Sequence, residues 1–329
     1  MKITDKVICP NLELKNRLIM PPMATAKAGP NGEVTEEILK YYDEKTSHGL
    51  FAAVIVEHNY VDPLGMAHKN QMSVSKDSDI DGLKKLSGII KKNGSKAILQ
   101  ISHAGSMAKK EVTGHQCLAP SPVKSPTGNN PQIPHELTKA EIEKLKKQFI
   151  DAAIRVKEAG FDGVEIHSAH GYLLDQFLSP LSNKREDEYG KDIYGRIKIH
   201  LDIIRGIKEE LRDYPVFIRM GAGDFKEGGL STEDAIIAAG EFEKAGVDLI
   251  DVSGGMCFYT IKDTRPGYFD TISKPVFDNV NIPVMLTGGV KKGQDVNDIL
   301  SRNVCNLVGI GRSVFNDSSW MEREIGTII

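Results

Sequence analysis

Short runs of apolar residues recur along the chain, and each is followed by a segment with helical periodicity. Continuous rather than alternating hydrophobicity is typical of parallel strands that are covered on both faces. We therefore predict eight strands, which are, in chain order, Arg17–Pro21, Ala52–Val56, Ala97–Ile101, Gly163–Ile166, Val216–Arg219, Leu249–Val252, Val284–Thr287 and Leu307–Ile310.

The clearest of the intervening helices begins at Thr138. Thr138 and Glu141 have the spacing of a capping box, which satisfies free backbone amides of the first helical turn. Gly160 follows the helix, because glycine adopts the left-handed conformation of a helix end at low cost. The apolar stripe between these ends is Ile142, Leu145, Phe149, Ala152 and Val156. The sequence EAGFDGVEI at 158–166 is echoed by KAGVDLIDV at 244–252, as a repeated joint between helix and strand would produce.

The alternation of strands and helices predicts an α/β fold, a (β/α)8 TIM barrel that forms one domain over residues 1–329. A doubly wound open sheet is the rival fold, but it usually carries G-x-G-x-x-G after its first strand, and nothing after Pro21 resembles that motif. Long connections at 103–137 and 253–275 follow the third and sixth strands, on the side where barrel enzymes have their active sites. The segment around Pro10-Asn11 predicts a hairpin that caps the other end of the barrel.

Composition and charge narrow the class of protein. With 40% hydrophobic and 26% charged residues, the chain is ordinary for a soluble globular protein. Its formal net charge of -3 gives it no electrostatic attraction for nucleic acid or for an anionic membrane surface. Charged residues interrupt the N-terminal segment, and no apolar run approaches the roughly 18 residues of a membrane span. We expect a cytoplasmic protein without a signal peptide.

The four cysteines lie far apart and form no C-x-x-C pair. This spacing argues against a zinc or iron–sulfur site and fits a reducing compartment. The four residues are Cys9, Cys117, Cys257 and Cys305.

Glycines follow the last two predicted strands. The seventh strand ends in Thr287-Gly288-Gly289, and the eighth ends in Gly309-Ile310-Gly311-Arg312. Barrels often bind phosphate with these two loops, because glycines let backbone N–H groups approach the oxygens and an arginine adds a charged fork. The alternative is that the glycines only form tight turns. The position of both loops and Arg312 favour a phosphate site.

His167 and His170 follow the fourth predicted strand, and Tyr172 comes directly after them. Two imidazoles at this end of the barrel can direct N–H donors to one point, which suits a carbonyl oxygen that gains negative charge in a transition state. A single histidine at such a position could instead have a structural role. The two histidines could also be metal ligands, but no third ligand is evident. Gln100 and Arg219 end the third and fifth strands, where they could contact the edge of a heterocycle or serve as paired residues at the barrel rim.

Taken together, these segments resemble the old yellow enzymes, the FMN-dependent NAD(P)H oxidoreductases, and among them the thermophilic-like or bacterial branch with a paired His-x-x-His. The matching residues run in family order over almost the whole chain. They are Leu14-Lys15-Asn16-Arg17, Pro22-Met23, Gln100 to Gly105, Glu165-Ile166-His167, His170-Gly171-Tyr172, Phe177 to Pro180, Ser182-Asn183, Arg185, Asp187 to Gly190, Arg219 and Gly309 to Arg312.

The resemblance implies a role for each matching residue. His167 and His170 would bind the carbonyl oxygen of an α,β-unsaturated substrate, flavin N5 would deliver hydride to the β-carbon, and Tyr172 would protonate the α-carbon. NADH or NADPH would reduce the flavin. The residues implied to contact FMN are Pro22, Met23, Ala24, His58, Gln100, Arg219, Gly288, Gly289, Gly311 and Arg312.

The chain also departs from the family pattern. Ala24 stands where relatives have a threonine or cysteine that tunes the flavin, Ala26 where one branch has a tyrosine, and Ser106 where the HAGR motif has arginine. The usual GGSxENR motif reads Gly190-Lys191-Asp192-Ile193-Tyr194-Gly195-Arg196. Because the chain ends at Ile329, we expect neither the iron–sulfur and dinucleotide-binding domains of dienoyl-CoA reductase relatives nor a C-terminal arginine lent to a neighbouring subunit.

Reduction of the C=C bond of α,β-unsaturated carbonyl compounds is the favoured function. The second hypothesis is a flavin-dependent reductase of quinones, nitro compounds or oxygen, for which Tyr172 would be dispensable. An RNA-modifying flavin barrel of the dihydrouridine-synthase type would require a basic surface, which the net charge of -3 opposes. A flavin-binding protein without turnover is the remaining alternative. The expected partners are small-molecule substrates, with a homo-oligomer left open.

Overall fold

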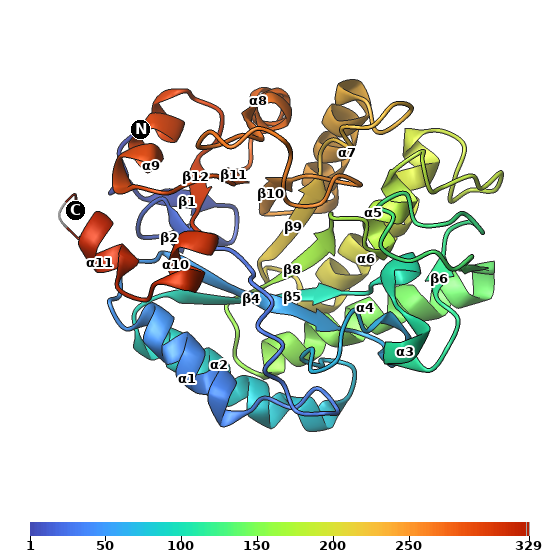
Figure 1. The fold of residues 1–329 in the computed structure, drawn as a ribbon, viewed down its shortest axis with the longest axis horizontal. Coiled ribbons are helices and arrows are strands. Elements are labelled where there is room, and N and C mark those ends of the chain that lie inside the picture. The colour runs from blue at the N-terminus through green and yellow to red at the C-terminus, as the bar shows by residue number, and fades with distance from the viewer. Residues whose placement is uncertain (327, 329) are drawn as a thin grey trace.

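The computed structural model describes residues 1–326 and 328. Eight parallel strands close into a barrel in the order β10-β11-β12-β3-β4-β5-β8-β9, and the helices surround them (Figure 1). The predicted TIM barrel is therefore confirmed, and each predicted strand is present. The barrel strands are β3 (Leu18–Met20), β4 (Ala53–Tyr60), β5 (Lys96–Ser102), β8 (Gly163–Ser168), β9 (Val216–Gly221), β10 (Leu249–Ser253), β11 (Val284–Thr287) and β12 (Leu307–Gly309).

The longer helices bury one apolar face each and, with the outward-facing side of the strands, form the main core. They are α1 (Glu36–Thr46), α2 (Ile80–Lys92), α4 (Lys139–Glu158), α6 (Ile193–Leu211), α7 (Thr232–Ala245), α8 (Asp270–Asn279) and α9 (Gly293–Ser301). Short helices are α3 (Lys110–Thr113), α5 (Leu173–Leu178), α10 (Arg312–Asn316) and α11 (Trp320–Glu324), with 3-10 turns at Pro63–Gly65, Asp77–Asp79 and Gly105–Met107. Within the described residues, no helix combines the length and apolar character needed to cross a membrane.

Helix α4 has the predicted ends. The Thr138 hydroxyl accepts a hydrogen bond from the Glu141 N–H, and the Glu141 carboxylate accepts one from the Thr138 N–H at 2.7 Å. Gly160 follows the C-cap with a φ of 76°, in the left-handed region that glycine adopts without strain. The capping box and the glycine therefore fix both ends of this helix.

The barrel interior is apolar at the N-terminal end of the strands. This inner cluster is formed by Ile19, Ala53, Ile55, Ile98, Phe217, Leu249, Met285 and Leu307. The antiparallel hairpin β1 (Val7–Cys9) and β2 (Leu12–Leu14) packs on the cluster, and Asn11 Nδ2 donates to Asp248 Oδ1 at 2.7 Å. The predicted hairpin therefore does close this end of the barrel.

Towards the C-terminal ends of the strands the interior becomes polar. The inward-facing residues one or more steps further along the strands are Gln100, Glu165, Arg219, Asp251 and Thr287, of which all but Thr287 are buried. A buried polar group costs free energy unless it is paired, so such a cluster is unusual in a core and marks this end as the functional one.

The repeated sequence at 158–166 and 244–252 has a structural reason. Asp162 precedes β8, and its carboxylate accepts from the Ala97 N–H of β5 at 2.9 Å. Asp248 precedes β10, and its carboxylate accepts from the Val216 N–H of β9 at 2.8 Å. In both joints an aspartate satisfies a backbone N–H at the start of the neighbouring strand, and it thereby sets the register.

The two long connections are more ordered than predicted. Residues 103–137 carry a short parallel sheet of β6 (Leu118–Ala119) and β7 (His135–Glu136), next to α5 (Figure 1). The connection after β10 is shorter than the predicted 253–275, because α8 begins at Asp270 and includes Pro275. Both connections leave the C-terminal side of the barrel.

Candidate active site

The three residues predicted to bind and protonate a substrate come together at the end of β8. The ring of Tyr172 stacks on His167 with centroids 4.6 Å apart and an interplanar angle of 27°. His170 lies edge-on to His167, with ring centroids 5.1 Å apart. The three side chains form one wall of the site. His167 and His170 are buried, and Tyr172 is partly exposed to solvent.

The turn after β8 gives these side chains their directions. His170 and Gly171 have φ values of 59° and 72°, so the backbone reverses between the two functional residues. The Gly171 N–H donates to Asp175 Oδ2 at 2.7 Å, and the His170 N–H donates to the Gly254 carbonyl. A side chain at position 171 would strike Thr127 at 2.4 Å, so this turn requires glycine.

His58, at the end of β4, is a third imidazole of the same cluster. Its ring is 5.3 Å from that of Tyr172 and 6.1 Å from that of His167. Strand β4 extends beyond its predicted end at Val56, which carries His58 to the height of the β8 residues. The structure thus joins a residue expected at the cofactor to those expected at the substrate.

Burial and neighbouring positive charge keep these histidines neutral. The pKa of His167 lies well below its ordinary value because of burial and then the proximity of His170, His58 and Arg219. Burial and Arg219 lower the pKa of His170 in the same direction. A neutral imidazole can still donate one N–H, so the pair can bind an oxygen that becomes negative. Burial raises the pKa of Tyr172, which therefore keeps its proton.

Arg219 lies one strand from His167, as its register partner on β9. Its Nε is 3.2 Å from Oδ2 of Asp251 on β10, and both side chains are buried. Next to them Gln100 Nε2 donates to Glu165 Oε1 at 2.7 Å. Two carboxyl groups thus face one guanidinium, and burial together with Asp251 raises the pKa of Glu165 well above its ordinary range. Glu165 is therefore the neutral member of the set.

The guanidinium end of Arg219 has no partner among the described residues. No hydrogen bond of its guanidinium occurs there, and Nε is buried without a hydrogen-bond partner, in a side chain that is only 5% exposed. A buried N–H donor without a hydrogen-bond partner costs free energy. A polar or anionic group bound at this end of the barrel would remove that cost.

The two glycine loops lie side by side above β11 and β12. Gly288 and Gly289 have φ values of 152° and 76°, and a Cβ at 289 would lie 2.4 Å from the Arg265 carbonyl. A Cβ on Gly311 would lie 2.9 Å from Met23 Sδ, so this loop also contacts the segment after β3. Arg312 is exposed, with Nη2 3.3 Å from the hydroxyl of Tyr268. Two glycine turns and a cation thus surround one region.

The segment after β3 is held by a buried carboxylate. Glu57 of β4 accepts hydrogen bonds from the backbone N–H and the hydroxyl of Thr25, both at 2.7 Å. Pro22 and Met23 are partly buried, and Ala24 is exposed. Glu57 therefore fixes the strip of chain that carries three of the residues expected at the flavin.

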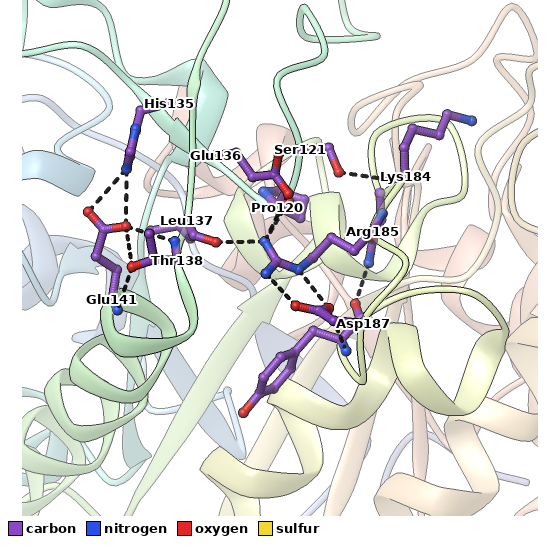
Figure 2. A network of polar contacts seen from close by, with 12 residues as sticks. Pro120, Ser121, His135, Glu136, Leu137, Thr138, Glu141, Lys184, Arg185 and Asp187 are labelled. Carbon is purple, nitrogen blue, oxygen red and sulfur yellow. Dashed lines mark hydrogen bonds and ion pairs between the residues drawn. The ribbon is translucent and has the colours of Figure 1, made fainter.

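Arg185 explains part of the sequence motif that follows α5. Its guanidinium donates to the carbonyls of Pro120 and Leu137 and pairs with the Asp187 carboxylate through two hydrogen bonds (Figure 2). It therefore ties the loop after α5 to the residues that directly follow both strands of the small sheet β6/β7. The motif is structural, since it secures the long connection beside the histidine cluster.

The structure shows the surroundings of two residues, Ser106 and Gly195, that depart from the family pattern. Ser106 is buried, and its N–H donates to Gln176 Oε1 while the hydroxyl has no partner within the described chain. Gly195 lies so close to Gly190 that a Cβ would be 1.9 Å from the Gly190 carbonyl. The altered motif thus has a glycine in the first turn of α6, where the helix passes the Gly190 carbonyl.

Sequence reasoning missed several residues at this site. The ring of Tyr259 lies edge-on to that of His170, with centroids 5.9 Å apart. The ring of His68 lies edge-on to that of His58, with centroids 5.5 Å apart. Tyr268 covers Gly288, and its hydroxyl donates to the Tyr259 carbonyl at 2.6 Å. The only signal in the sequence was that both tyrosines fall in the predicted long connection after the sixth strand.

These features fit FMN. The unpaired end of Arg219 can meet the polar edge of an isoalloxazine ring, with Gln100 beside it, and the glycine turns with Arg312 can take a phosphate. In the described part of the chain, no group of three or more His, Cys, Asp or Glu side chains is arranged to hold a metal ion. Fold and site together define a flavin-binding barrel oxidoreductase.

The chain belongs to the NADH:flavin oxidoreductase / NADH oxidase family, whose sequence profile matches residues 8–325. An NADH oxidase of Thermoanaerobacter brockii is 36% identical over 321 residues, covering 95% of this chain and 49% of that protein. An NADPH dehydrogenase of Geobacillus thermodenitrificans is 35% identical over 309 residues, covering 94% of this chain and 89% of that protein. The chain thus spans about half the length of the first relative and most of the second.

Solved structures agree with the fold. A 2-naphthoyl-CoA reductase in complex with 2-naphthoyl-CoA superposes with a TM-score of 0.91 at 25% identity, over 99% of this chain and 52% of that chain. An old yellow enzyme homologue from Zymomonas mobilis superposes with a TM-score of 0.86 at 20% identity, over 100% of this chain and 94% of that chain. The predicted family, with FMN as its cofactor and NADH or NADPH as its electron donor, is confirmed.

Proposed function

We propose that this protein is an ene-reductase, which reduces the C=C bond of α,β-unsaturated carbonyl compounds at the expense of NADH or NADPH. When bound, FMN carries two electrons as a hydride from the nicotinamide to the substrate. The residues proposed to hold FMN are Pro22, Met23, Ala24, His58, Gln100, Arg219, Gly288, Gly289, Gly311 and Arg312. The observation that carries the proposal is the stack of Tyr172 on His167 beside His170.

His167 and His170 are proposed to donate hydrogen bonds to the carbonyl oxygen. Both are neutral donors in a buried site, where hydrogen bonds to a developing negative charge are stronger than in water. His170 Nε2 lies 2.8 Å from the Ser253 hydroxyl, which orients its ring. Charge on the oxygen would also be stabilised by Arg219, whose positive charge reaches both imidazoles.

Tyr172 is proposed to supply the proton that completes the reaction at the α-carbon. Its phenol is held against His167, within the same wall as the two oxygen donors. A phenol with a raised pKa remains protonated at neutral pH, and it is still a far stronger acid than the C–H bond formed. A quinone or oxygen reductase needs no such donor, so the tyrosine favours the ene-reductase.

Anaerobic stopped-flow measurements on the FMN-loaded enzyme test this function. The flavin is first bleached with NADH or NADPH, and its reoxidation is then followed with 2-cyclohexenone, a quinone or oxygen. We expect fast reoxidation by cyclohexenone with formation of cyclohexanone. Reoxidation by quinone alone, with no saturated ketone, would overturn the proposal in favour of the second hypothesis.

A further inference from the structure

Gln71, in the connection between β4 and α2, is a buried residue that no part of the proposed chemistry uses. It is 1% exposed, and its side-chain amide contacts three groups. Oε1 accepts from the Ala67 N–H at 2.7 Å, and Nε2 donates to the His58 carbonyl at 3.1 Å. Nε2 also lies 2.6 Å from His58 Nδ1. Every polar atom of the amide therefore has a partner.

The two backbone contacts determine which way the amide points. A backbone N–H can only donate and a backbone carbonyl can only accept, so Oε1 must face Ala67 and Nε2 must face the His58 carbonyl. The amide NH2 group then has its second hydrogen directed at His58 Nδ1. Because an amide nitrogen cannot accept a hydrogen bond, Nδ1 must be the unprotonated nitrogen of that ring. The imidazole hydrogen of His58 therefore lies on Nε2.

This restriction distinguishes His58 from the other two imidazoles of the site. His170 Nε2 faces a serine hydroxyl, which can donate or accept, and His167 Nδ1 has no partner in the described residues. His58 also cannot easily gain a second proton, since burial, His68 and Arg219 lower its pKa to about 3. Of the three, only His58 is held as one neutral tautomer by the protein itself.

The Nε2–H of His58 is a donor without an acceptor among the residues that the structure describes. The hydrogen bond of this ring in the described chain involves Nδ1 alone, and the ring lies edge-on to those of His68 and Tyr172. A fixed donor beside the proposed proton donor suits an oxygen atom of a bound ring system.

We propose that Gln71 is a positioning residue that locks His58 as an N–H donor, and that His58 donates this hydrogen bond to an oxygen acceptor bound in the pocket. The acceptor belongs either to the flavin or to the substrate, and both present an oxygen on a planar conjugated system. The proposal rests on the pocket described under the proposed function, but its first test does not depend on turnover.

The first test measures the tautomer directly. Long-range ¹H–¹⁵N correlation spectra of the ¹⁵N-labelled, FMN-loaded protein report which ring nitrogen of each histidine carries hydrogen, and His58→Gln identifies the His58 signals. His48 is an internal reference, because its Nδ1 accepts from the Leu50 N–H at 3.0 Å and is likewise unprotonated. We expect the same pattern for His58. A hydrogen on Nδ1, or a doubly protonated ring at neutral pH, would overturn the proposal.

Substitution of Gln71 tests whether this residue fixes the tautomer of His58. In Gln71→Glu a carboxylate replaces the NH2 group, so Nδ1 should gain a hydrogen while the His48 signals stay unchanged. Gln71→Met, which removes the amide without adding charge, should leave a mixture of tautomers and serves if the glutamate variant does not fold. A His58 that keeps its hydrogen on Nε2 alone in the folded variant would refute the positioning role. The parent spectrum decides the tautomer even when both variants fail.

The second test finds the acceptor. His58→Phe keeps a ring against Tyr172 and removes the N–H, with His48→Phe as the matched control. Loss of one neutral hydrogen bond should weaken binding by about three- to tenfold. Weaker binding of FMN to the apoprotein assigns the acceptor to the flavin, and weaker binding of phenol to the FMN-loaded protein assigns it to the substrate site. Unchanged constants for both would refute the donor role. An enzyme that fails to reduce cyclohexenone would refute the ene-reductase alone.

Discussion

Arg219 and Asp251 are register partners on adjacent strands and meet inside the barrel, with Nε 3.2 Å from Oδ2. The pair partly neutralises the charge of the guanidinium, and Nη1 and Nη2 form no hydrogen bond within residues 1–326 and 328. Asp251 thereby limits how strongly Arg219 can stabilise a negative charge above it. This arrangement predicts the effect of removing the carboxylate.

Asp251→Asn should raise the reduction potential of the bound flavin. The asparagine keeps the shape of the side chain but removes a negative charge, so the reduced flavin is stabilised relative to the oxidised form. We expect a rise of at least about 30 mV, which corresponds to 1.4 kcal/mol for a two-electron couple. The potential is measured against a reference dye. Asp248→Asn, which removes a buried carboxylate at the other end of the barrel, should leave it unchanged.

The pH dependence of stability should carry a contribution from Glu57. Burial raises its pKa to about 7, although hydrogen bonds from Thr25 favour the carboxylate. A carboxyl with a higher pKa in the folded chain binds more protons there, so the free energy of unfolding falls as the pH rises from about 4.5 to about 7. The fall is about 3 kcal/mol for this group. Urea unfolding at several pH values should show a smaller fall in Glu57→Gln, and an equal fall would contradict the assignment.

Arg312→Ala should weaken the binding of FMN. The loss of a charge-assisted contact to phosphate corresponds to roughly 1.5–3 kcal/mol, or about 10- to 150-fold in the dissociation constant. Fluorescence titration of the apoprotein measures it. Tyr268→Phe removes the hydroxyl 3.3 Å from Arg312 Nη2 and should have a smaller effect. Undiminished FMN binding in Arg312→Ala would show that the phosphate lies elsewhere.

The success of the sequence-based fold prediction has a physical cause. Parallel strands are buried on both faces, so their apolar runs are visible in any single sequence. The strand ends were underestimated where the barrel interior becomes polar. Glu57 and His58 continue β4, and His167 and Ser168 continue β8, although none of them is apolar. The site itself caused these errors, because its polar residues interrupt the pattern that marks a strand.

The predicted site was incomplete for a different reason. His167, His170 and Tyr172 are close in sequence, so their proximity could be inferred from one strand end. Gln71 meets His58 only because the connection after β4 folds back, and Tyr259 reaches His170 from a connection two strands away. Such contacts depend on the path of the loops, for which hydrophobic periodicity gives no signal.

His167→Ala and His170→Ala should each slow the reduction of cyclohexenone by roughly 10²–10³, the usual cost of losing one oxyanion donor. Flavin content should stay unchanged, because neither residue is proposed to hold FMN. Binding of phenol, followed by its charge-transfer band, should weaken in both variants. Ser253→Ala, which removes the hydroxyl 2.8 Å from His170 Nε2, should give a smaller defect. Loss of flavin without a specific kinetic defect would indicate a structural role instead.

Tyr172→Phe separates the two leading functions. Hydride transfer to the β-carbon leaves negative charge at the α-carbon, which needs a proton before the C=C bond is fully reduced. Reduction of quinone or oxygen requires no protonation of carbon. The substitution removes one hydroxyl and keeps the ring that stacks on His167, so the fold and the flavin should be retained. Any kinetic defect can then be attributed to the missing proton donor.

General acid catalysis is typically worth about 10²–10⁴ in rate, and we expect Tyr172→Phe to lose that much in flavin reoxidation by cyclohexenone. Flavin reduction by NADH or NADPH and reoxidation by quinone should change little in the same preparation, which serves as the control. A nitroalkene is a further comparison, since its stabilised nitronate product can take a proton from water. An unchanged rate with cyclohexenone would remove the proton-donor role from Tyr172 and favour a reductase of quinones or oxygen.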